Sequence, residues 1–142
     1  MVQAIPKEVV VKVMTSTKSV DIVYDFLQDA KNWETGGILK SVTRSGNNSW
    51  TCDTPVGKAR IYCEPNKNCN ILDHVFVAGN IKWDVYVRII SNGTGSTTTW
   101  TFLRPEGLDM NEFEKQLKGF DSEITGWKKT LENTQVRRSL TC

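Results

Sequence analysis

The sequence predicts an α+β protein in which an antiparallel sheet packs against one long C-terminal helix. Three observations carry this prediction. An apolar stripe recurs at helical spacing near the C-terminus, strand-like segments separated by short turns precede it, and the turns place large apolar residues on one strand face. With a length of 142 residues, the chain fits a single domain over residues 1–142.

The long helix is predicted over Leu108–Leu131. Asp109 is expected to cap its start, and Glu112 to complete a capping box. Gly119 and Gly126 fall away from the apolar stripe, where each should cost up to about 1 kcal/mol relative to alanine. The sequence gives no reason for these glycines. The stripe itself has spacings of three and four: Met110, Phe113, Leu117, Phe120, Ile124, Trp127 and Leu131.

The other elements come earlier in the chain. Residues 7–14 are β-branched and partly alternating, which predicts a first strand. Two short helices should follow, the first capped by Ser19 and the second ended by Gly36 and Gly37. Six further strands, joined mostly by short turns, predict an antiparallel meander and, with the first strand, a seven-stranded sheet. Their segments are ILKSVTRS, NSWTCDT, GKARIYCE, NILDHVFVA, IKWDVYVRII and GSTTTWTFLR.

Two turns predict which strand face is buried. One is a two-residue hairpin turn at Gly79-Asn80, and the other is a four-residue turn over residues 92–95. Both place the same large apolar residues on one face, which is expected to meet the long helix. The predicted cross-strand pairs on that face are Ala78 with Ile81, Phe76 with Trp83, His74 with Val85, Leu72 with Val87, Ile89 with Thr98, Val87 with Trp100, and Val85 with Phe102.

Composition argues against several classes of function. The net charge is +2 with Lys and Arg spread along the chain, so we expect no nucleic-acid partner. No apolar run approaches the ~18 residues that span a bilayer, so we expect no integral membrane association. The N-terminus MVQAIPKEVV is unlike a signal peptide, which predicts a cytoplasmic protein. The sequence leaves open whether it is a monomer or a homodimer.

The cysteines predict no metal site. The four of them show no CxxC spacing, and the chain has one histidine, so we expect neither a metal nor another cofactor. Free thiols are the simplest interpretation in a reducing compartment. Cys52 and Cys63 flank a predicted turn and could face one another across two strands, where a crosslink is conceivable.

The order of elements resembles the helix-grip fold of the START-like or SRPBCC superfamily. The segments that carry this resemblance are SVDIVYDFLQDAKNW, LDHVFV, WDVYVRIISNGTGS, TWTFLRPEGLD and EITGWKKTLE, and it covers nearly the whole chain. The superfamily includes polyketide cyclase/dehydrase-like proteins, birch-pollen-allergen-like plant proteins and lipid-transfer START domains. It implies a strongly curved sheet that grips the long helix, with a cavity between them. It implies no particular reaction.

His74 is the first candidate for chemistry, because the register places this histidine on the inner face. It could be a hydrogen-bonded core residue, a ligand contact or a proton-transfer group, and burial would lower its pKa. The aromatic residues of the inner face could line a cavity or simply fill a core. Candidate polar partners at the inner face or rim are Thr98, Cys63, Cys52, Gln116 and Glu123. Trp127 and Leu131 are expected to close the cavity floor.

The leading hypothesis is a protein that binds a small hydrophobic or aromatic ligand between the sheet and the C-terminal helix. One alternative is a polyketide cyclase/dehydratase-like enzyme that uses His74 for proton transfer. Another is a regulatory or protein-interaction module. The predicted ligand-binding residues are His74, Phe76, Trp83, Val85, Val87, Thr98, Trp100, Phe102, Phe113, Leu117 and Phe120.

Overall fold

A computed structural model describes residues 5–141, and the side chains of residues 5–133. The elements follow the predicted order, with one additional 3₁₀ turn, η2. They are β1 (Val9–Ser16), α1 (Val20–Gln28), the 3₁₀ helix η1 (Ala30–Gly36), β2 (Lys40–Arg44), β3 (Ser49–Thr54), β4 (Gly57–Asn66), η2 (Lys67–Cys69), β5 (Ile71–Ala78), β6 (Ile81–Asn92), β7 (Gly95–Leu103) and α2 (Met110–Thr141).

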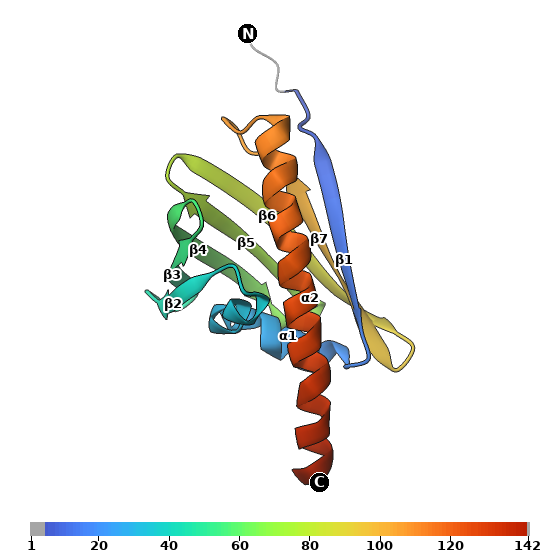
Figure 1. The fold of residues 1–142 in the computed structure, drawn as a ribbon. Helices are drawn as coiled ribbons and strands as arrows, with labels where there is room; N and C mark the ends of the chain where they lie inside the picture. Colours follow the sequence, from blue (N-terminus) through green and yellow to red (C-terminus); the bar gives the residue numbers. More distant parts are fainter. Residues whose placement is uncertain (1–4, 142) are drawn as a thin grey trace.

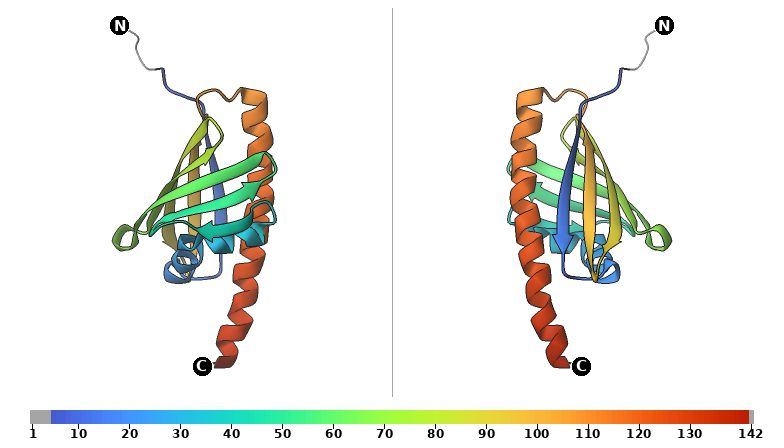
Figure 2. Two further views of the ribbon diagram at one scale, coloured as in Figure 1. Left: turned by 90° about the vertical axis from the view of Figure 1, so that its left-hand side faces the viewer. Right: turned by 90° about the vertical axis from the view of Figure 1, so that its right-hand side faces the viewer.

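The strands form one seven-stranded antiparallel sheet with the order β1-β7-β6-β5-β4-β3-β2. The six strands β2–β7 follow one another as a meander, as the sequence predicts, and β1 pairs with β7. The sheet is strongly curved, and α2 runs across its concave side while α1 and η1 lie near one end (Figure 1). The side views show the strands bending around the helix (Figure 2).

The predicted register is confirmed on both sides of β6, although the predicted pair of Leu72 with Val87 does not form. Phe76 pairs with Trp83 and His74 with Val85 across β5 and β6. On the β7 side, all three predicted pairs form, namely Ile89 with Thr98, Val87 with Trp100, and Val85 with Phe102. The second turn is tighter than predicted, because Asn92 already pairs with Gly95 and leaves two residues at the tip. The register is unaffected, since the same strand residues remain opposite one another.

The helix α2 begins as predicted and ends later. The Asp109 carboxylate accepts a hydrogen bond from the Glu112 backbone N–H at 2.8 Å, which is the expected cap. The reciprocal arm of the capping box is replaced, because the Glu112 carboxylate accepts from the Gln116 amide. Residues 132–141 contain no glycine or proline to stop the helix, so it continues beyond the apolar stripe to Thr141. At its full length it is about 48 Å long and projects past the sheet (Figure 1).

The closest backbone approaches of α2 are to η1 and to β1 rather than to the central strands. At the η1 contact, a Cβ atom added to Gly126 would lie 2.6 Å from the carbonyl oxygen of Thr35 and 2.9 Å from the Cα atom of Gly36. Only a residue without a side chain allows this approach. Gly126 therefore lies against η1, which explains one of the two unexplained glycines. Gly119 faces open space, and nothing in the structure accounts for it.

Two tryptophans fasten the same contact. The Trp33 indole N–H donates to the Leu27 carbonyl at 2.8 Å, which ties η1 to α1. The Trp127 indole N–H donates to the Trp33 carbonyl at 3.0 Å, which ties α2 to η1. Both rings are buried, so each polar N–H needs such a partner.

The suggested pairing of Cys52 with Cys63 is wrong. Cys52 lies opposite Ala59, and Cys63 lies opposite His74 on the next strand. The β3–β4 turn sets this register, because Thr54 pairs with Gly57. Cys52, Cys63 and Cys69 are all free thiols, and burial raises the pKa of both Cys52 and Cys63 to about 11. Cys142 lies outside the described residues.

Alanine substitutions at the two glycines of α2 should have opposite effects. Gly126→Ala should lower the free energy of unfolding by about 1–3 kcal/mol, because its methyl group collides with the backbone of η1. Gly119→Ala should raise it by up to about 1 kcal/mol, because the new methyl meets open space and alanine favours the helix. Urea unfolding of both variants measures this. Equal effects in the two variants would contradict the proposed contact.

Candidate ligand-binding cavity

A cavity of about 120 Å³ lies between the concave face of the sheet and α2. Residues from α1, η1, the three strands β5–β7 and α2 line it, together with Leu39 from the segment that follows η1. The lining residues are Leu27, Trp33, Leu39, Leu72, His74, Phe76, Trp83, Val85, Val87, Trp100, Phe102, Gln116, Leu117, Phe120, Glu123 and Trp127.

Most of the predicted ligand-binding residues come together around this cavity, and two lie elsewhere. Phe113 is fully buried and stacks on Trp83, with ring centroids 5.6 Å apart, so it backs the cavity wall. Thr98 is fully buried beside Met14 and Ile89, and its hydroxyl has no hydrogen-bond partner among the described residues. Neither residue is part of the lining.

Several lining residues are absent from the predicted set. Leu27, Trp33 and Leu39 belong to the segment between β1 and β2, whose position over the sheet depends on tertiary packing. Trp127 was expected at the floor and does line the cavity. Gln116 and Glu123 were expected as polar partners at the inner face or rim, and both line the cavity.

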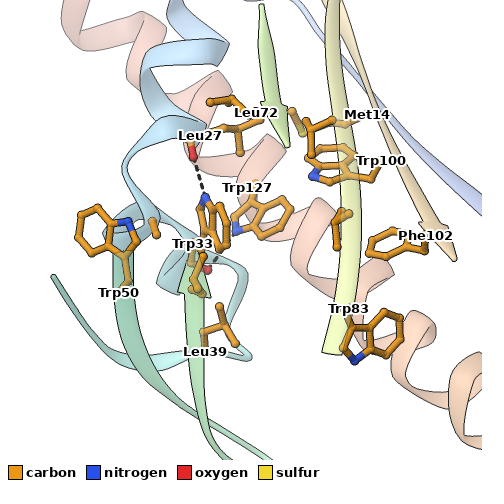
Figure 3. Close-up of a cluster of buried hydrophobic side chains, with 14 of the residues drawn as sticks. Met14, Leu27, Trp33, Leu39, Trp50, Leu72, Trp83, Trp100, Phe102 and Trp127 are labelled. Carbon is orange, nitrogen blue, oxygen red and sulfur yellow. Dashed lines mark hydrogen bonds between the residues drawn. The ribbon is translucent and has the colours of Figure 1, made fainter. Parts of the chain in front are cut away.

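Aromatic rings form most of one end of the cavity. The Trp127 ring lies 5.7 Å from that of Trp100, 5.3 Å from that of Phe120 and 6.4 Å from that of Trp33, measured between centroids. These side chains come from α2, β7 and η1, and Trp33 and Trp127 face one another between helix and sheet (Figure 3). All four of these aromatic residues line the cavity.

His74 lies at an irregular point of the sheet. The ladder between β5 and β6 is interrupted between the Ile71–Arg88 and His74–Val85 pairs. There the Val87 N–H donates to the Asp73 carboxylate at 2.8 Å, and His74 Nδ1 lies 3.1 Å from the Leu72 carbonyl oxygen. These two side chains thus take over backbone groups that a regular ladder would pair.

The hydrogen bond to Leu72 fixes the state of the His74 ring. A carbonyl oxygen can only accept, so Nδ1 carries the proton and Nε2 keeps a lone pair. Burial lowers the pKa of His74 to about 4, and the Leu72 carbonyl and Asp73 only partly offset this. The ring also packs against Trp33, with centroids 4.9 Å apart. His74 is therefore neutral at pH 7 and offers one hydrogen-bond acceptor.

Glu123 is the acidic residue of the cavity. Only 8 % of its surface is exposed, and its carboxyl group has no hydrogen-bond or ion-pair partner among the described residues. Burial raises its pKa to about 8, so the group is mostly protonated at pH 7. No lysine or arginine stands among the lining residues, so nothing of opposite charge compensates it within the described part of the chain.

No arginine stands among the described residues that line the cavity. Arg88 pairs with Asp73, and Arg104 pairs with Glu8. Arg60 is exposed on β4.

Across the residues that the structure describes, no group of three or more His, Cys, Asp or Glu side chains could hold a metal ion. No helix within residues 5–141 is long and apolar enough to cross a membrane.

The raised pKa of Glu123 predicts a pH-dependent stability. In the unfolded chain this carboxyl should titrate near its usual pKa of 4.5, and in the folded protein near 8. Folding therefore favours the protonated form, and its contribution is full below about pH 4.5 and lost as the pH rises through 8. Relative to Glu123→Gln, the wild-type free energy of unfolding should fall by at least about 1 kcal/mol between pH 5 and pH 9.

Urea unfolding at a series of pH values measures this difference. Glu114→Gln is the matched control, because Glu114 lies on the exposed side of the same helix. Its difference from the wild type should stay nearly constant with pH. A constant difference for Glu123→Gln as well would contradict the burial of an ionisable group at this position.

Comparison with known proteins supports the fold. No protein-family model matches the sequence, and no curated protein matches it. Among solved structures, Ara h 8.0201 has a TM-score of 0.72 at 8 % identity, over 89 % of this chain and 98 % of its own. TTHA0849 from Thermus thermophilus has a TM-score of 0.69 at 11 % identity, over 89 % of this chain and 99 % of its own. The chain adopts the helix-grip fold, as its resemblance to the START-like (SRPBCC) superfamily predicts.

Proposed function

We propose that the protein binds a small hydrophobic or aromatic molecule in the cavity between the sheet and α2. The observation that carries this proposal is a cavity walled mostly by aromatic and aliphatic side chains, with a few polar groups in its lining. Such a combination is typical of ligand sites, where apolar walls provide affinity and isolated polar groups set orientation.

The size of the cavity limits the ligand. Its volume is about 120 Å³, and an engineered apolar cavity of about 150 Å³ takes up benzene. Sites for drug-sized ligands usually exceed about 300 Å³. The cavity therefore fits a compound with a single ring, and a sterol or a fused polycyclic molecule would require the walls to move. A ligand of this size is expected to bind with a dissociation constant of roughly 10 µM to 1 mM.

The polar groups favour a ligand that is not an anion. At pH 7 His74 offers an acceptor at Nε2, and the protonated Glu123 can donate one hydrogen bond and accept others. Gln116 adds an amide at the same wall. With no cationic residue in the described lining, a buried carboxylate on the ligand would have no counter-charge.

Proton-transfer catalysis is a second candidate function, favoured by His74 and Glu123 lining the same cavity. Their environments push the two pKa values in opposite directions, to about 4 and about 8, which leaves a neutral base and a neutral acid together. The low pKa of His74 makes it a weak base, so we rank this function below binding. Turnover of a polyketide-like substrate that His74→Ala abolishes would establish it.

Filling the cavity should prevent ligand binding. Val87→Phe adds a ring at a buried lining position and should weaken the binding of benzyl alcohol at least tenfold, measured by calorimetry and tryptophan fluorescence. Val13→Phe is the matched control, because Val13 is 54 % exposed on β1. It should bind like the wild type, and circular dichroism checks that both variants fold. Equal affinities in the two variants would mean that the probe binds elsewhere.

A further inference from the structure

We propose that the ligand of this cavity is an organic cation, a small amine or ammonium compound with an apolar body, whose charge is held by Glu123. The inference rests on the proposed binding function and adds the chemical class of the ligand. Its starting observation is that Glu123 is more than nine-tenths buried, lines the cavity, and has no partner in the described part of the protein.

An unpartnered buried carboxyl is costly, and the rest of the protein does not offset the cost. Removing a carboxylate from water costs several kcal/mol unless a charge or hydrogen bonds replace the water. Glu132 on the same helix is satisfied by contrast, because it accepts hydrogen bonds from the Ser16 hydroxyl and the Thr17 backbone N–H. Glu123 is thus placed where only a molecule inside the cavity could compensate its charge.

The titratable groups around Glu123 leave this role to a ligand. Cys52 on β3 is close enough to be influenced by the Glu123 charge, and it stays protonated because burial raises its pKa. His74 on β5 is neutral, because burial lowers its pKa. Neither supplies a positive charge at neutral pH, and the described lining contains no lysine or arginine. Electrostatic complementarity therefore favours a cationic ligand.

The aromatic walls suit the same guest. Phe120 and Trp127 lie three residues before and four residues after Glu123 on α2, so all three project from one helical face. The Trp127 ring is 5.7 Å from that of Trp100 across the cavity end. A cation over a tryptophan or phenylalanine face is attracted by the ring electrons, and the attraction is greater where water is excluded. One acid beside several rings is a combination that recognises ammonium groups.

The charge balance of binding is simple. The free protein holds Glu123 as a neutral acid, and an alkylammonium guest carries one positive charge at neutral pH. On binding, Glu123 loses its proton to the solvent, and the resulting carboxylate pairs with the ammonium group. Well below pH 8 about one proton is released per ligand. Affinity should therefore rise up to tenfold for each unit by which the pH is raised toward 8, and it should level off above that pH.

Three probes of nearly the same size separate the possibilities: benzylamine, benzyl alcohol and benzoate. Titration calorimetry at pH 7.5 should show benzylamine binding at least tenfold more tightly than benzyl alcohol, and no binding of benzoate. In Glu123→Gln the affinity for benzylamine should fall at least tenfold and that for benzyl alcohol by less than threefold. Glu114→Gln, the exposed control on the same helix, should behave like the wild type.

The outcomes distinguish this inference from the proposed function. If benzyl alcohol binds as tightly as benzylamine, or if Glu123→Gln leaves benzylamine unaffected, the ligand class is wrong while the cavity remains a binding site. If none of the probes binds the wild type at any pH, both proposals fail. Should Glu123→Gln not fold, the wild type alone decides: a pH-independent affinity for benzylamine, with no proton released, would overturn the inference.

Discussion

The contact between η1 and α2 determines how far the long helix stands from the central strands of the sheet. Gly36 and Gly126 bring the two backbones together, and the Trp127 indole hydrogen bond to Trp33 secures them. Because α2 is held at η1 and at β1, it does not settle onto the central strands. Large side chains bridge the remaining distance, and the space they do not fill is the cavity. A helix that packed directly on β5–β7 would leave no such space.

The sequence predicted the sheet almost completely, because local rules determine it. The Gly79-Asn80 turn fixes cross-strand partners, and one correct pair predicts the others except where the ladder is interrupted at Leu72 and Val87. The extent of α2 was harder to predict, because after Leu131 no apolar stripe marks the helix and no breaker ends it. The role of Gly126 could not be predicted at all, since it depends on its contact with Thr35 and Gly36, which are distant in the sequence.

The same distinction holds for the cavity. Strand parity and helical spacing identified His74, Trp100 and Phe120 on facing surfaces, so residues on regular elements were placed well. Trp33 and Leu39 come from the connection between β1 and β2, whose path over the sheet follows no periodic pattern. Whether an aromatic residue lines a hollow or fills a core depends on how far apart the layers stand, which sequence spacing does not reveal.

The cavity combines neutral groups that could each become charged. Burial lowers the pKa of His74 and raises that of Glu123, so both side chains are mostly neutral at pH 7. The interior is thereby free of uncompensated charge when empty, while Glu123 keeps the capacity to ionise once a suitable partner enters. The stability of the empty protein and the selectivity of the cavity would then have the same origin in the burial of one carboxyl group.

A crystal structure determined under xenon pressure would test most directly whether a cavity able to accept a small molecule lies between the sheet and α2. Apolar hollows of this size take up xenon without chemical specificity. We predict a xenon atom among Trp100, Phe120 and Trp127 with the surrounding side chains unmoved. Side chains packed into that space, with no xenon between the helix and the sheet, would contradict it.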